Sequence, residues 1–167
     1  SLYSKLKTAE ERVFIEPVSA ASYCRLVLEE SMYLIYDAEH LNKPFNIELI
    51  NLMNEEAIKN IIPFQLHEGL HIVRKKGNNA SNYANRINSK DALISIRYIY
   101  DFTKWLAQTY SAEIPDLPGA FNEAFIPKLG EKQRLLKEQQ QEQENAYQQL
   151  QEQIAKLQQE KEAILEK

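Results

Sequence analysis

The sequence contains one cysteine, four glycines and six prolines in 167 residues. A single cysteine excludes a disulfide framework and a zinc site built from several thiolates, and it suits the reducing cytoplasm. The scarcity of glycine and proline disfavours an all-β protein, whose many turns use these residues. Long apolar runs are also missing, because charged residues such as Arg97 interrupt them. We therefore expect a helical, cytoplasmic protein with no segment that crosses a membrane.

The charge balance is slightly acidic. There are 20 basic and 24 acidic residues, which gives a formal net charge of −4 at pH 7. Domains that bind the nucleic-acid backbone non-specifically usually carry a clear positive excess, so this class of function is disfavoured. The length suits about one domain. Because the chain starts without methionine and stops inside a helical pattern, "KEAILEK", we expect it to be a segment of a longer protein.

Composition divides the chain into three regions. Residues 113–128 contain half of the prolines, which break regular structure. Residues 131–167 contain neither glycine nor proline and are rich in glutamine, which predicts one long helix. We expect an all-α fold with a helical bundle in residues 1–112, a Pro-containing linker in 113–128 and a coiled-coil helix in 129–167.

An apolar stripe in the first region predicts a helix that is buried on more than one side. Apolar or small residues recur there at alternating steps of three and four, at Ala20, Cys24, Val27, Ser31, Leu34, Ala38 and Leu41. A second apolar row beside this stripe consists of Leu28, Met32 and Ile35. A helix with two such rows belongs in the middle of a bundle. The place of Cys24 in the stripe predicts an inert core residue.

Four further segments have helical patterns. "NIELINLMN" is expected to begin at Asn46 and "NEEAIKNII" at Asn54, because asparagine is a favoured N-cap. We expect a third helix over Pro63–Lys76 and a last one from an N-cap at Ser89 to about Ser111. One face of the last helix consists of Ala92, Ile96, Ile99, Thr103, Leu106 and Tyr110. Its aromatic residues are more typical of a core than of a surface that stacks bases.

Apolar residues repeat with a seven-residue period in the third region. This heptad pattern is typical of a coiled coil. Its predicted seam, the apolar side that contacts a partner helix, consists of Leu136, Tyr147, Leu150, Ile154, Leu157 and Ile164. A helix this polar is marginal alone in water. We therefore expect it to pair with a second copy, with another segment of the parent protein or with a partner subunit.

The letters "HEGLH" match the zinc-protease pattern H-E-x-x-H. His67 and His71 would supply two metal ligands, and Glu68 would supply the general base. A third ligand is missing, because Arg74 and Gly77 stand where the extended pattern has glycine and histidine. Arg74 would also bring a positive charge toward the metal. We therefore assign no metal ligand and no catalytic residue here.

The same helix has a cationic edge. Its predicted buried stripe consists of Leu66, Leu70 and Val73. Cations complement the carboxyl end of a helix, and Gly77 is the expected left-handed stop. A half-buried boundary face therefore accounts for the run "RKKG". The other interpretation is an interaction or phosphate-contact face that consists of His67, His71, Arg74, Lys75, Lys76, Asn78 and Asn82.

The stretch "VRKKGNNASN" resembles the turn of HEPN-like helical domains. There an arginine at a helix end is followed by a Gly-Asn turn and then by a histidine. Arg74, Gly77 and Asn78 match this turn, whereas Asn82 takes the place of the histidine. In HEPN ribonucleases the histidine acts on the RNA 2′-hydroxyl and the arginine steadies the phosphate, and asparagine cannot exchange protons near neutral pH. The resemblance thus implies a HEPN-like fold without ribonuclease chemistry.

The order of the parts resembles the amino-terminal region of type I restriction enzyme R subunits and of related helicase-containing restriction proteins. The likeness is carried by "FIEPVSAASYCRLVLEESMYLIYD", by the stretch 74–82, by "ALISIRYIYDFTKWLAQTY" and by the proline-rich link into the glutamine-rich helix. In those proteins a HEPN-like domain and a coiled coil precede a nuclease domain and an ATP-dependent DNA translocase. This segment has neither a phosphate loop nor a carboxylate cluster for magnesium. We therefore expect it to catalyse no reaction and to need no cofactor.

The resemblance implies a non-catalytic assembly region of a restriction-modification R subunit. Its partners would be a second copy or other subunits of the restriction system, bound through the bundle and the coiled coil, and DNA would be reached through the parent complex. Two alternatives stay open. One is an RNA-binding HEPN module with a degenerate ribonuclease motif, and the other is a coiled-coil scaffold protein unrelated to restriction.

Overall fold

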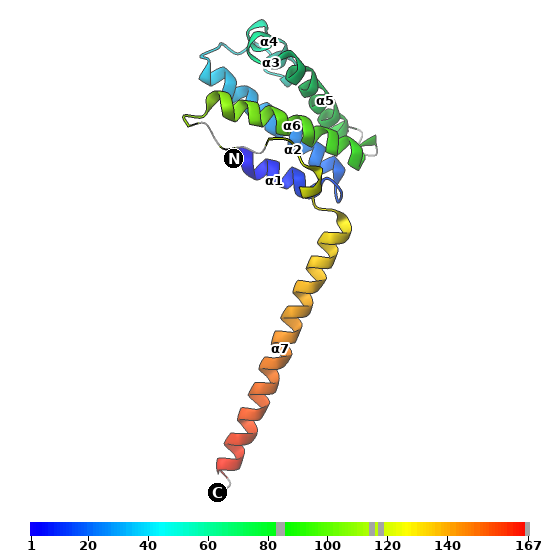
Figure 1. Ribbon diagram of the computed structural model, residues 1–167, viewed down its shortest axis with the longest axis vertical. Coiled ribbons are helices and arrows are strands. Elements are labelled where there is room, and N and C mark those ends of the chain that lie inside the picture. Colours follow the sequence, from blue (N-terminus) through cyan, green and yellow to red (C-terminus); the bar gives the residue numbers. More distant parts are fainter. Residues whose placement is uncertain (83–85, 114–115, 117–118, 166–167) are drawn as a thin grey trace. The chain divides into compact units, whose positions relative to one another are not determined.

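In the computed structural model of this chain, all regular secondary structure of the described residues is helical (Figure 1). The structure describes the backbone of residues 1–82, 86–113, 116 and 119–165, and the side chains of these residues apart from 129–137 and 165. The chain divides into two compact units, Ser1–Pro127 and Lys128–Lys167. The prediction of an all-α protein is confirmed.

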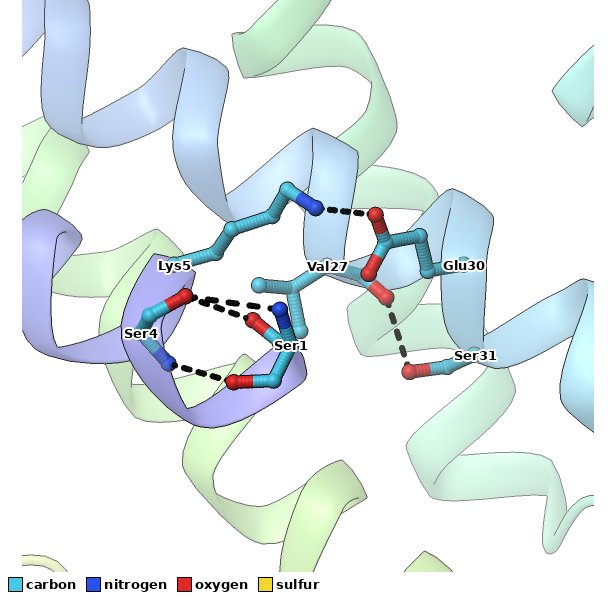
Figure 2. Close-up of polar contacts among 6 residues, drawn as sticks. All are labelled: Ser1, Ser4, Lys5, Val27, Glu30 and Ser31. Atoms are coloured by element: carbon cyan, nitrogen blue, oxygen red, sulfur yellow. Dashed lines mark hydrogen bonds and ion pairs between the residues drawn. The ribbon is translucent and has the colours of Figure 1, made fainter.

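Helix α1 (Leu2–Arg12) begins the first unit, and the sequence pattern does not predict it. The backbone N–H of Ser4 donates to Ser1 Oγ at 3.4 Å, which caps the first turn (Figure 2). Lys5 forms an ion pair with Glu30 of the following long helix (Figure 2). The helix therefore has a capped start and a polar tie to its neighbour, in addition to its packing on the core.

Helix α2 (Pro17–Ala38) is the central element of the first unit and packs against α1, α5 (Phe64–Asn82) and α6 (Ser89–Tyr110) (Figure 1). The two predicted apolar rows are buried through most of the helix, but Leu34 is 39% exposed and Ala38 is also exposed. The predicted stripe repeats every seven residues, and such a stripe rotates by about 20° per repeat around a straight helix. Its last members therefore turn away from the core.

Two short helices, α3 (Leu49–Asn54) and α4 (Glu56–Ile61), occur where the sequence predicts them. Their predicted caps are wrong. Asn46 accepts the backbone N–H of Glu48 at 3.0 Å in a turn before α3, and Asn54 is the last residue of α3. An asparagine side chain fits a turn as well as a helix start, so residue type alone does not separate the two.

Side chains from α2 and α5 hold the carboxyl end of α3. Tyr36 Oη donates to the carbonyl oxygen of Leu52 at 2.9 Å, and His67 Nε2 lies 2.8 Å from the carbonyl oxygen of Met53. All four residues are buried. The last carbonyls of a helix have no partner within the helix. These two contacts therefore satisfy oxygens that would otherwise be buried and unpaired.

Helix α5 continues through Gly77 to Asn82, so the predicted stop at Gly77 is wrong, and Gly77 and Asn78 do not form the Gly-Asn turn on which the HEPN resemblance relied. Gly77 lies at a close crossing of α5 and α2, where an added Cβ would be 2.4 Å from the Cβ of Arg25. Gly69 faces α6 in the same way, and an added Cβ there would be 2.4 Å from Cδ1 of Tyr98. Both glycines therefore allow neighbouring helices to approach closely.

Helix α6 is capped by Asn88 rather than by the predicted Ser89. The Asn88 side chain accepts the backbone N–H of Asp91 at 3.0 Å, and the Asp91 side chain accepts the backbone N–H of Asn88 at 3.2 Å. This reciprocal pair is a capping box. The predicted apolar face of α6 is buried or half-buried, and Phe102 adds a further buried ring.

The chain after α6 returns to the first unit. The short helix η2 (Glu123–Phe125) precedes Ile126, which is buried. The ring of Phe121 lies 5.6 Å from the ring of Tyr100 in α6. The carboxyl-terminal part of the predicted linker therefore packs on the bundle. Two of the linker's prolines lie outside the described residues, Pro115 and Pro118.

Helix α7 (Leu129–Leu165) forms nearly all of the second unit and is the long helix that the third region predicts. It contains 37 residues. At about 1.5 Å per residue its length is about 55 Å. Helix formation here is consistent with the absence of glycine and proline after residue 130.

Candidate functional site

Two residues of the predicted interaction face hold the bundle together. His67 is only 6% exposed, and its Nε2 contacts the carbonyl oxygen of Met53. Lys76 forms an ion pair with Asp91, the residue that also caps α6. The hydrogen bond from Lys76 is the main cause that lowers the pKa of Asp91, so this carboxylate stays charged. Both side chains therefore have partners within the bundle.

The other members of the predicted face have mixed surroundings. Lys75 and Asn82 are exposed, and His71 is half-buried. The His71 ring stands edge-on to the His67 ring, with 4.8 Å between the centroids. Burial lowers the pKa of His71, and so do the neighbouring His67 and Arg74. His71 is therefore neutral at pH 7.

Protonation of His71 is expected to destabilise the fold. Its pKa in the folded chain lies below 6.5, so the unfolded chain binds more protons as the pH falls past 6.5, and the free energy of unfolding decreases. The variant His71→Gln should lose less stability between pH 7.5 and pH 5.5 than the parent chain. Urea unfolding followed by fluorescence of Trp105, the only tryptophan, measures this difference. Equal losses in both proteins would contradict the prediction.

A cleft of about 440 Å³ lies between α2, α5, the segment that leads into α3 and the first turn of α3. Arg25 enters it from α2, and its Nε donates to Asn78 Oδ1 at 2.8 Å. Its Nη1 lies 3.3 Å from Glu29 Oε2. The stem of Arg25 lies against Gly77, so both the stem and the guanidinium group have defined contacts. Arg74 and Asn78 line the cleft from α5.

Arg74 differs from every other polar residue of the cleft. Its Nε is buried and has no hydrogen-bond partner, and its guanidinium forms no ion pair with a described residue. Burial lowers the pKa of Arg74, with a smaller effect from Arg25. An arginine nevertheless keeps its charge in proteins. Because buried donors are nearly always paired, Arg74 is the group in the cleft with the greatest need for a ligand.

Arg25 is the second cation of the cleft, and the predicted contact face does not include it. It follows Cys24 directly, one step outside the buried stripe of α2. The feature of the sequence that could have identified Arg25 is a positive charge within a helix that is expected to be buried on more than one side. Its contact with Asn78 joins residues 53 positions apart, so only the packing of α2 against α5 shows that they share a site.

The cleft offers hydrogen-bond donors rather than groups that exchange protons near neutral pH. No histidine or cysteine is among the described residues that line it. Cys24 is fully buried in the core, and burial raises the pKa of its thiol. Across the described part of the chain, no three side chains of histidine, cysteine, aspartate or glutamate are placed to hold a metal ion. Anion binding is the chemistry that this arrangement supports.

The predicted seam of α7 is the second candidate site. Five of its side chains are between 47% and 74% exposed, namely Tyr147, Leu150, Ile154, Leu157 and Ile164. They recur at steps of three, four and seven along a continuous helix, so they share one side of it. The side chain of Leu136, the remaining seam residue, lies outside the described residues.

Comparison with known protein families, with curated proteins and with solved structures found no match to this chain. In the described part of the chain, no helix combines the length and the apolar character needed to cross a membrane. The cleft and the seam of α7 are therefore the two features of this chain that bear on its function.

Proposed function

We propose that this chain is a non-catalytic assembly segment whose long helix α7 pairs with a second copy of itself. The observation that carries the proposal is the exposed seam, in which five large apolar side chains lie on one side of a single helix. When two such helices wind around each other, these side chains are removed from water. Full burial of a leucine or isoleucine contributes about 1.5–3 kcal/mol.

The residues beside the seam favour a partner of the same sequence. Several of these flanking positions are uncharged glutamines, Gln151, Gln153 and Gln158. In a pair of identical helices the flanking positions meet one another, and like charges there would repel. Lys161 interrupts the apolar side, and a single polar residue in a seam restricts the register and the number of helices.

We propose further that the segment belongs to the R subunit of a type I restriction-modification system. The support is the resemblance in the order and sequence of its parts. In that setting the bundle and α7 connect other subunits to the nuclease and to the ATP-dependent DNA translocase of the parent chain, in the cytoplasm. The net charge of −4 suits a segment that reaches DNA only through the parent complex. A coiled-coil scaffold outside restriction is the alternative.

Sedimentation equilibrium of the chain tests the pairing of α7. We expect a dimer that dissociates on dilution, with a parallel loss of helical circular dichroism, because an isolated helix as polar as α7 is marginal in water. A chain that is monomeric and fully helical at every concentration would refute the pairing.

A binding experiment tests the link to restriction. We expect the chain to co-elute with the methyltransferase and specificity subunits of its own system. The counter-test is the parent protein without residues 1–125. Failure of the chain to bind, together with normal assembly of that shortened parent, would remove the restriction role while leaving the pairing of α7 intact.

A further inference from the structure

The cleft between α2 and α5 contains a positive charge without a counter-ion. Glu29 is the partner of Arg25. The guanidinium group of Arg74 has neither a hydrogen bond nor an ion pair with any described residue, and its Nε is buried. Arg74 as a whole is half-buried, so the unfavourable part is the buried Nε–H, which has neither water nor a protein partner. An anion in the cleft would give the guanidinium group of Arg74 the ion pair that it lacks among the described residues.

The charges that line the cleft favour a ligand with a single negative charge. Glu29 and Glu48 both line it, so a group with two negative charges would be repelled from two sides. Since Glu29 already pairs with Arg25, the positive charge that awaits a partner is that of Arg74. The carboxylate of Glu48, which has no ion pair with a described residue, further disfavours a second negative charge on the ligand. One negative charge is therefore the best match.

The shape and the remaining lining favour a carboxylate with an apolar body. Beside the charged groups, the cleft is lined by Tyr33, Ile47, Leu49 and Ile50. Its volume of about 440 Å³ falls in the usual range of small-molecule sites. A carboxylate is planar and can accept two parallel N–H bonds from one guanidinium group. Arg74 would hold the carboxylate, and the apolar wall would cover the body.

We propose that this cleft binds a carboxylate carried on an apolar body, with Arg74 in contact with the carboxylate and Arg25 beside it. The source is a small carboxylic acid or an acidic side chain of a partner polypeptide, and both present the same group. A nucleic-acid backbone fits less well, because carboxylates line the cleft and Lys76 is already paired with Asp91. The binding is independent of the pairing of α7.

Nuclear magnetic resonance of the arginine Nε–H groups in the whole chain tests the proposal. The probes are phenylpropanoate, its neutral amide and the peptide acetyl-Leu-Glu-Leu-amide. We expect both carboxylates to shift the Arg74 signal saturably at millimolar concentration or below, whereas the neutral amide leaves it unchanged. Tighter binding of the peptide supports a polypeptide source, and tighter binding of phenylpropanoate supports a small-molecule source.

Three results from these titrations would overturn the proposal. The first is an Arg74 signal that does not move with either carboxylate. The second is an equal response to the neutral amide, which would show that the charge plays no part. The third is a saturable response to a short single-stranded RNA with none to the carboxylates, which would assign the cleft to phosphate instead.

Three variants locate the binding charge. Arg74→Gln is expected to lose at least tenfold in affinity for phenylpropanoate. Lys75→Gln is the matched control, because it removes one exposed positive charge from the same helix, and its affinity should equal that of the parent chain. Retained binding in Arg74→Gln, or an equal loss in Lys75→Gln, would refute the assignment.

The third variant, Glu48→Gln, removes a negative charge that lines the cleft at the start of α3. It should bind phenylpropanoate at least as tightly as the parent chain, because repulsion of the carboxylate is reduced. Glu48→Gln tests the role of charge in the cleft even if Arg74→Gln does not fold. Weaker binding in Glu48→Gln would show that the charges of the cleft have been assigned wrongly.

Discussion

The variant in which Leu150 and Leu157 are both replaced by serine is expected to associate at least about a thousandfold more weakly than the parent chain. Both side chains are more than half exposed on the single helix, and pairing would bury them. Truncation of a buried leucine costs about 2–5 kcal/mol, and about 4 kcal/mol corresponds to a thousandfold change in affinity. Sedimentation over a wide concentration range measures the loss.

The matched control is the variant in which Gln149 and Gln159 are both replaced by serine. These positions lie off the seam of α7. Leucine and glutamine have similar helix propensities, so both variants weaken the isolated helix by a similar small amount. The control should associate as the parent chain does. A loss as large as that of the seam variant would mean that helix propensity, rather than burial of the seam, determines the pairing.

The long helices α2, α6 and α7 could be predicted from the sequence because each repeats an apolar pattern over many turns. Helix α1 lacks such a signal. Its only fully buried residue is Ala9, and a single alanine does not form an apolar pattern that can be recognised in the sequence. Its position depends on a cap at Ser1 and on its contact with α2, which local periodicity does not reveal.

Arg74 and Asn78 could be grouped from the sequence because they lie one turn apart on one helix. The role of Gly77 could not be predicted, since glycine is favoured both at a helix end and at a close crossing of helices. His67 presents the same difficulty. Its place beside an apolar stripe is visible in the sequence, but its partner, the carbonyl oxygen of Met53, comes from another helix.

Arg25 could not be predicted from the sequence as a residue of the cleft. Sequence periodicity indicates which side chains share a face of one helix, but it does not indicate which helix covers that face. The cleft arises only where α2 and α5 meet the segment before α3. The assignment of Arg74 to a candidate contact face was therefore possible before the structure, whereas its missing counter-ion and its neighbour Arg25 required the packed bundle.

Joint replacement of Tyr36 by phenylalanine and of His67 by leucine should lower the free energy of unfolding of the first unit by about 2–4 kcal/mol. Each change leaves a buried carbonyl at the end of α3 without its partner. Burial, together with Glu55, raises the pKa of Tyr36, so its hydroxyl is a donor at neutral pH. A domain is stable by about 5–15 kcal/mol, so the loss is a substantial part. Urea unfolding followed by Trp105 fluorescence measures it.

The control for this prediction is Tyr110→Phe, which removes a hydroxyl bonded to the exposed Glu39 at 2.7 Å. Its cost should stay below about 1 kcal/mol, because water can replace the lost partner. Tyr36→Phe and His67→Leu together should lower the free energy of unfolding by less than the sum of the two single changes. The reason is that once α3 detaches, water reaches both carbonyls.

The variant with both Tyr36→Phe and His67→Leu should also show faster hydrogen exchange in α3. It should bind phenylpropanoate more weakly than the parent chain, because Leu49 and Ile50 of α3 line the cleft. Fully additive losses with unchanged exchange in α3 would show that the two carbonyls do not anchor this helix. In that case the wall of the cleft would depend on the apolar contacts of Leu49, Leu52 and Met53 alone.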